Sequence, residues 1–107
     1  MGTFDEREEG FEKRFVVEET LDFKARARSN KLLGLWAAQL TGKKGADADA
    51  HAMALVASQV ARADDGALFE TLRADLNGAG VEISDHRIRR KMEETLAQAR
   101  ADIAAGR

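Results

Sequence analysis

Apolar residues recur at helical spacing through the first 40 residues of the chain. Placing residues at about 100° per step gives one stripe along a long helix that runs from Phe4 to Leu40. The residues of this expected core stripe are Leu21, Ala25, Leu32, Leu35 and Trp36. Gly34 falls on the far side of the same helix, where a glycine favours the close approach of another helix.

A second apolar stripe, formed by Phe4, Phe11 and Phe15, precedes the first. It is rotated from the core stripe by roughly 60° on the same helical geometry. Two stripes with this offset cannot both lie in the middle of one flat seam. The pattern therefore predicts a break or flexible joint between about Gly10 and Thr20.

Three shorter helices are predicted after a connection at residues 41–45. The first is expected to be capped by Asp47 or Asp49 and to reach about Ala63, with Met53, Val56, Ala57 and Val60 pointing inward. The next follows a cap at residues 64–66, has Leu68, Phe69, Leu72 and Leu76 on one side, and is stopped by residues 77–80. Ser84 caps the last helix, whose stripe is Ile88, Met92, Leu96, Ala99 and Ile103.

These elements predict an all-α fold, a four-helix bundle with a long N-terminal helix and a mobile N-terminal arm. We define the arm as residues 1–19 and the body as residues 20–107. The absence of proline and the abundance of alanine favour helix throughout. No apolar run approaches the roughly 20 residues of a membrane span, so we expect no membrane insertion and a cytoplasmic protein.

Catalysis fits this composition poorly. The chain has no cysteine, and its only histidines are His51 and His86. Asp47, His51 and Asp49 have a spacing found in metal pairs, but no third ligand is evident, so we expect neither a metal nor a cofactor. The net charge of −2 provides no general attraction to nucleic acid.

A basic cluster at the start of the last helix is a weaker candidate site. Arg87, Arg89, Arg90 and Lys91 could contact the phosphates of a nucleotide. Because Ile88 is expected to point inward, however, the four side chains fan over different faces. We therefore expect no nucleic-acid binding, and weak nucleotide binding remains an alternative.

The arm carries the stronger functional signal. Its three phenylalanines lie on one side of a helix, with Glu8 between them and charged residues beside them. One alternative is that this helix folds back and buries the rings on its own body. Aromatic anchors at helical spacing are also what a helix needs in order to fill a groove on a partner protein.

Three separated segments, Phe4–Arg7, Asn30–Ala38 and Ile83–Met92, closely resemble the zeta subunit family. This family comprises small inhibitors of the alphaproteobacterial F-type ATP synthase. The resemblance covers nearly the whole chain and implies a helical bundle with an inhibitory N-terminal segment, Thr3 to about Val17. That segment would become ordered on entering an α/β interface of the catalytic head. The implied contacts are Phe4, Asp5, Arg7, Glu8, Phe11, Arg14 and Phe15.

The same resemblance implies the partners and the location. The partners are the α, β and γ subunits of the catalytic head, and the association with the inner membrane is peripheral, through the synthase. The free protein is expected to be a monomer and not an enzyme. Gly10 stands where the family pattern favours a helix former, which predicts weaker inhibition. The alternative is a non-inhibitory helical adaptor, or a weak nucleotide-sensing module that uses the Arg87–Lys91 cluster.

Overall fold

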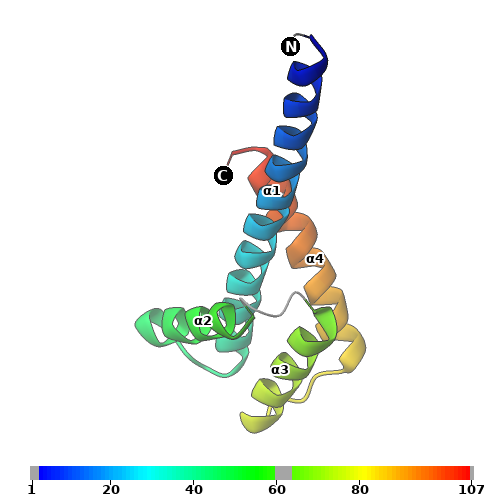
Figure 1. Ribbon diagram of the computed structural model, residues 1–107. Coiled ribbons are helices and arrows are strands. Elements are labelled where there is room, and N and C mark those ends of the chain that lie inside the picture. The colour runs from blue at the N-terminus through cyan, green and yellow to red at the C-terminus, as the bar shows by residue number, and fades with distance from the viewer. Residues whose placement is uncertain (1–2, 60–63, 107) are drawn as a thin grey trace.

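The computed structural model describes residues 3–59 and 64–106, with side chains from residue 20 onward. This part of the chain forms four α-helices: α1 (Thr3–Leu40), α2 (Gly45–Gln59), α3 (Asp65–Gly78) and α4 (Asp85–Ala104). It contains no strand, which confirms the predicted all-α fold. Figure 1 shows α4 running beside α1 in the opposite direction, with α2 and α3 gathered around the C-terminal half of α1.

The helix ends follow the local chemistry that the sequence predicts. The Asp64 carboxylate accepts a hydrogen bond from the Gly66 N–H at 2.8 Å, and the Ser84 hydroxyl accepts one from the Arg87 N–H at 3.1 Å. Two residues after the ends of α1 and α3 stand Gly42 and Gly80, which have φ values of 82° and 73°. In each case the residue after the glycine donates to a carbonyl five residues back, at 2.9 Å. This helix-ending motif requires the left-handed backbone that glycine adopts without strain.

The start of α2 differs from the prediction. Neither Asp47 nor Asp49 caps the helix, because α2 begins at Gly45 and both residues lie inside it. The Asp47 N–H donates to the Lys44 carbonyl at 3.2 Å. Asp47 lies in the first turn, where its negative charge still complements the positive end of the helix dipole. The structure describes α2 as far as Gln59, and Val60 and Ala63 lie outside the described residues.

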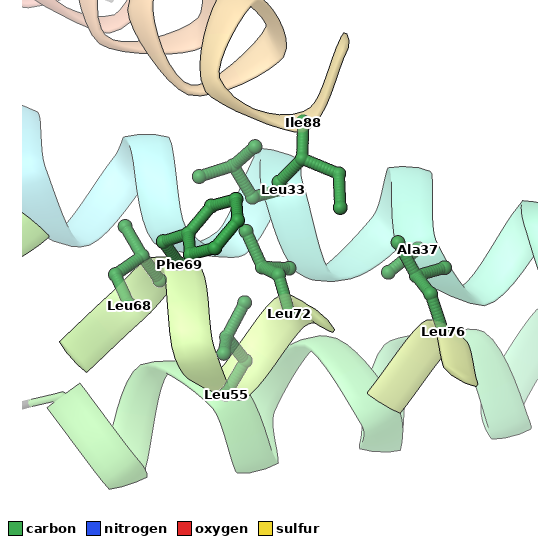
Figure 2. Close-up of a cluster of buried hydrophobic side chains, with 8 residues drawn as sticks. All are labelled: Leu33, Ala37, Leu55, Leu68, Phe69, Leu72, Leu76 and Ile88. Atoms are coloured by element: carbon green, nitrogen blue, oxygen red, sulfur yellow. The ribbon is translucent and has the colours of Figure 1, made fainter. Parts of the chain in front are cut away.

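One hydrophobic core joins all four helices (Figure 2). Its buried residues are Leu33, Ala37, Leu55, Leu68, Phe69, Leu72, Leu76 and Ile88. Trp36, Val81, Ile83 and Met92 pack against this cluster and are partly buried. The predicted apolar side of α3 is confirmed in full, and the predicted stripe of α4 is buried or half-buried along its length.

The predicted core stripe of α1 is wrong in its centre. Leu33, which that stripe omitted, is completely buried, whereas Leu21 is 40% exposed. Leu32, Leu35 and Trp36 are half-buried. The physical reason is that α1 packs against α2 on one side and against α4 on another. Its buried surface is therefore wider than one stripe and is centred between the two neighbours.

The predicted inward face of α2 is wrong at Met53 and Ala57. Met53 is 55% exposed and Ala57 is exposed, whereas Val56 is half-buried and the buried residues are Ala48, Ala52, Leu55 and Gln59. The small residue Ala52 lies against Gly34 of α1, where an added Cβ atom would meet the Ala52 Cα at 2.6 Å. The face of α2 that is buried is thus the one that allows close approach of the two backbones, and not the one with the largest side chains. The predicted role of Gly34 in this approach is confirmed.

There is no break between Gly10 and Thr20, because α1 is one continuous helix of 38 residues. A flexible joint at these residues stays a prediction. The 60° offset that motivated the break came from the wrong core stripe. Positions 11 and 29 are 18 residues apart, and so are positions 15 and 33. Since 18 residues make about five turns, positions 11 and 15 lie on the same side of α1 as the buried residues Ser29 and Leu33.

Candidate functional site: the N-terminal part of α1 and its base

α1 is much longer than the helix that runs beside it. At about 1.5 Å per residue, its length is about 57 Å and that of α4 about 30 Å. The described chain is accordingly elongated, with extents of 64 × 26 × 22 Å. Figure 1 shows the first turns of α1 extending beyond the C-terminal end of α4.

A hydrogen bond between the two helices fixes where α4 stops along α1. The Ser29 hydroxyl donates to Thr95 Oγ1 at 3.2 Å, and both residues are buried. The helices are antiparallel and rise equally per residue, so the last residue of α4, Ala104, lies opposite about Thr20. Residues 3–19 of α1 therefore have no residue of α4 opposite them.

All seven residues implied by the resemblance lie in this part of α1. They are Phe4, Asp5, Arg7, Glu8, Phe11, Arg14 and Phe15. Their side chains lie outside the described residues, so their contacts stay predictions. Because α1 is continuous, it does fix the positions of these residues around the helix axis relative to those in the body. The positions of the three phenylalanines follow the side of α1 that faces α4 in the body, and this side continues where α4 has ended.

Polar side chains join α1 to α4 at the base of this segment. Arg28 Nε lies 3.0 Å from Asp102 Oδ2, and Arg100 Nη2 lies 3.2 Å from Asp22 Oδ1. The other oxygen of Asp22 lies 3.1 Å from Arg26 Nε. The hydrogen bond from Arg26, with a further one from Arg100, lowers the pKa of the Asp22 carboxyl. These pairs attach the last part of α4 to α1 just where the unaccompanied part of α1 begins.

Sequence reasoning missed this polar attachment. Opposite charges on separate helices give no spacing signal within either helix, so Asp22, Arg28, Arg100 and Asp102 could not be paired from the sequence. One signal was available: Ser29 and Thr95 interrupt apolar stripes at positions that helical spacing places inward.

The Arg87–Lys91 cluster does not form a convergent anion site. Arg89 stacks over the ring of Phe69 at 4.0 Å, and Lys91 lies 6.0 Å from the ring centre of Trp36. Arg90 pairs with Glu94 at 3.2 Å. Three of the four cations thus contact different partners, in agreement with the prediction that the four side chains point over different faces of the helix.

His51 is engaged in the body and not in a metal site. Its Nε2 atom lies 2.6 Å from Asp75 Oδ2, and the Lys43 Nζ donates to its Nδ1 at 2.9 Å. Among the side chains that the structure describes, in residues 20–59 and 64–106, no group of three or more His, Cys, Asp or Glu could hold a metal ion. Across residues 3–59 and 64–106, no helix has both the length and the apolar character needed to span a membrane.

The fold defines a small all-helical protein in which one long helix, α1, extends beyond the other three helices. The sequence model of the family described as ATPase inhibitor subunit zeta matches residues 1–102. The chain therefore belongs to the ATPase inhibitor subunit zeta family, which confirms the resemblance read from its three segments. A search of curated proteins finds no significant match. Membership of an inhibitor subunit family indicates a regulatory protein that interacts with an ATP synthase.

Proposed function

We propose that this protein inhibits ATP hydrolysis by the F-type ATP synthase, and that it does so by inserting the N-terminal part of α1 at an α/β interface of the catalytic head. The family match supports the inhibitory role. The observation that supports insertion is the length by which α1 extends beyond α4. About 17 helical residues have no α4 residue beside them.

The positions of the phenylalanines around α1 indicate the side of the helix on which the partner protein would lie. In the body, the side of α1 that bears Ser29 is covered by α4. The positions of Phe4, Phe11 and Phe15 continue that side beyond Ala104. A partner that covers these phenylalanines therefore takes the place along α1 that a longer α4 would occupy. An aromatic anchor in such an interface contributes roughly 1–3 kcal/mol.

The mechanism is steric. ATP hydrolysis by a rotary enzyme requires its catalytic interfaces to open and close in turn, and an inserted helix stabilises one of these states. The polar pairs at the base of the arm, Arg28–Asp102 and Arg100–Asp22, anchor α1 to the body. The body then remains outside the interface and limits how far the helix enters.

The test is an ATPase assay with the cognate enzyme and four forms of the protein: the full chain, a chain without residues 1–15, Phe11→Ala and Val16→Ala. Val16 is the matched control, because it lies about 140° around the helix from Phe11. We expect the deletion to abolish inhibition and Phe11→Ala to weaken it about five- to a hundredfold. Val16→Ala is expected to inhibit like the full chain.

The same assay separates the alternative function. Reversing the charges of the Arg87–Lys91 cluster should leave inhibition nearly unchanged, since three of the four side chains already have partners within the body. Inhibition that survives Phe11→Ala and is lost on this charge reversal would contradict insertion of the arm and favour the basic cluster.

A further inference from the structure

The charged positions beside the phenylalanine stripe of the arm are sorted by sign. Because α1 is continuous, each position has an angle around the helix axis, which we count from the middle of the stripe at about 100° per residue. On one side, at about 40–100° from the stripe, lies an acidic edge that comprises Asp5, Glu8, Glu12 and Glu19. On the other side, at about 60–80° from the stripe, lies a basic edge that comprises Arg7 and Arg14.

The other charges of the arm lie away from these two edges or at its base. Glu6, Glu9 and Lys13 lie at least about 140° from the stripe, on the opposite side of the helix. Glu18 lies on the side of the basic edge, but it comes two residues before Thr20, where the body begins. Over residues 4–15 the phenylalanines thus separate acids on one side from bases on the other.

The body shows what an arginine on the basic side of α1 meets. Arg28 follows Arg14 by 14 residues and lies about 40° farther from the stripe. Its Nε lies 3.0 Å from Oδ2 of Asp102 in α4, and the Asp102 side chain is only 10% exposed. The helix that covers the phenylalanine side of α1 therefore presents a carboxylate to this arginine. A partner that takes the place of α4 along the arm would have to do the same for the basic edge.

The body also shows that the acidic edge reverses the charge of α1. Glu8 comes 18 residues, or about five turns, before Arg26, so the two positions lie on the same side of the helix. Arg26 Nη1 lies 3.5 Å from Oδ1 of Asp65 in α3. In the body, a base of α1 thus faces an acid of its neighbour. Because Glu8 has the opposite charge, a neighbour of the arm must offer bases here, since opposed like charges weaken an interface.

We propose that the arm fits a groove of the catalytic head whose two walls have opposite charge, with lysine or arginine side chains against the acidic edge and carboxylates against Arg7 and Arg14. The apolar floor between the walls receives the phenylalanines. The inference rests on the proposed insertion of the arm. Charge pairs at the rim of an interface fix orientation more than they raise affinity. The two edges therefore decide how the helix is rotated about its axis as it enters.

The test exchanges charges across the stripe while the net charge stays constant. Glu12→Arg combined with Arg14→Glu puts a base on the acidic edge and an acid on the basic edge. The control, Glu9→Lys combined with Lys13→Glu, makes an equivalent exchange on the opposite side of the helix. In an ATPase assay with the cognate enzyme, we expect the first exchange to raise the inhibitory constant at least about tenfold. The control should stay within about twofold, because it reverses only an i,i+4 pair of the arm.

Single neutral substitutions test the two walls separately. Glu12→Gln and Arg14→Gln should each raise the inhibitory constant about three- to tenfold. Lys13→Gln is the matched control for Arg14→Gln, because Lys13 is adjacent in the sequence but lies on the opposite side of the helix. It should raise the constant less than about twofold, as expected for a solvated charge.

Phe11→Ala, measured in the same assay, separates this inference from the proposed insertion. A larger effect of the first exchange than of its control, with equal helix content by circular dichroism, supports walls of opposite charge. If Phe11→Ala weakens inhibition but the two exchanges change the inhibitory constant equally, the charged walls are excluded and the insertion stands. If Phe11→Ala also has no effect, the insertion fails and this inference fails with it.

Discussion

Gly34 of α1 lies directly against Ala52 of α2: a Cβ atom on Gly34 would stand 2.6 Å from the Ala52 Cα and 3.1 Å from its Cβ. Both residues are completely or almost completely buried. The obstacle is backbone, which cannot rotate away as a flexible side chain can. The two helices therefore pack at a distance that only a residue without a Cβ permits.

Gly34→Ala should accordingly destabilise the protein by about 1–3 kcal/mol, because α2 must move away from α1 and loosen the core around Leu33 and Leu55. Urea unfolding measures this change. Gly78→Ala is the control, since an added Cβ there meets no atom within 4 Å. It should be neutral or stabilising by up to about 1 kcal/mol. Equal midpoints for Gly34→Ala and the parent chain would show that the helices adjust freely.

Deletion of residues 1–15 should leave the body folded. The core cluster and the pairs between α1 and α4 all involve residues from position 22 onward, so none of these contacts is removed. We expect cooperative thermal unfolding, and a loss of circular-dichroism helix signal that corresponds to the deleted residues only. A broad transition, or a larger loss of helix, would mean that the arm phenylalanines belong to the core.

Gly10→Ala should tighten inhibition of the ATPase. A glycine within a helix costs about 1 kcal/mol relative to alanine, so the substitution favours the helical arm and lowers the inhibitory constant by up to about fivefold. Steady-state inhibition at several concentrations of the protein measures the effect, and Gly78→Ala in α3 is again the matched control. A weaker inhibitor would indicate that the partner approaches the backbone closely at position 10.

Asp22→Asn should reduce stability at neutral pH and have no effect in strong acid. The pKa of Asp22 is lower in the folded protein, chiefly through Arg26 and also through Arg100. A lowered carboxyl pKa gives stability that is present above the unfolded value of about 3.9 and is lost as the pH falls through the folded pKa. The pairs of Asp22 with Arg26 and Arg100 are exposed. We therefore expect Asp22→Asn to lower the free energy of unfolding at neutral pH by at most about 1 kcal/mol.

Urea unfolding of the Asp22→Asn and parent chains at pH 7, pH 4 and pH 2.5 gives the required comparison. The difference between them should shrink steadily as the pH falls. Glu82→Gln, at an exposed loop carboxylate, serves as the control and should show a smaller difference at pH 7. A difference for Asp22→Asn that persists undiminished at pH 2.5 would exclude its charge as the cause.

Local features of this protein could be predicted from the sequence alone. Asp64 and Ser84 cap their helices as expected, and glycines end α1 and α3, because each of these features depends on a few adjacent residues. The number of helices and the apolar side of α3 followed from helical spacing for the same reason. The three segments that resemble the zeta family could also be recognised in the sequence, and the family match confirms the resemblance.

Only the tertiary structure decided which side of α1 and α2 is buried. Helical spacing assigned Leu21 and Met53 to the core, yet both are exposed. On α2, the close contact of Ala52 with Gly34 places the side that bears Ala48, Ala52 and Leu55 against its neighbours, and Met53 lies off that side. The buried positions Ser29 and Leu33 also show that the phenylalanine positions of the arm continue the side of α1 that faces α4. The Arg28–Asp102 and Ser29–Thr95 contacts join residues more than 60 positions apart, so no local pattern could have shown them.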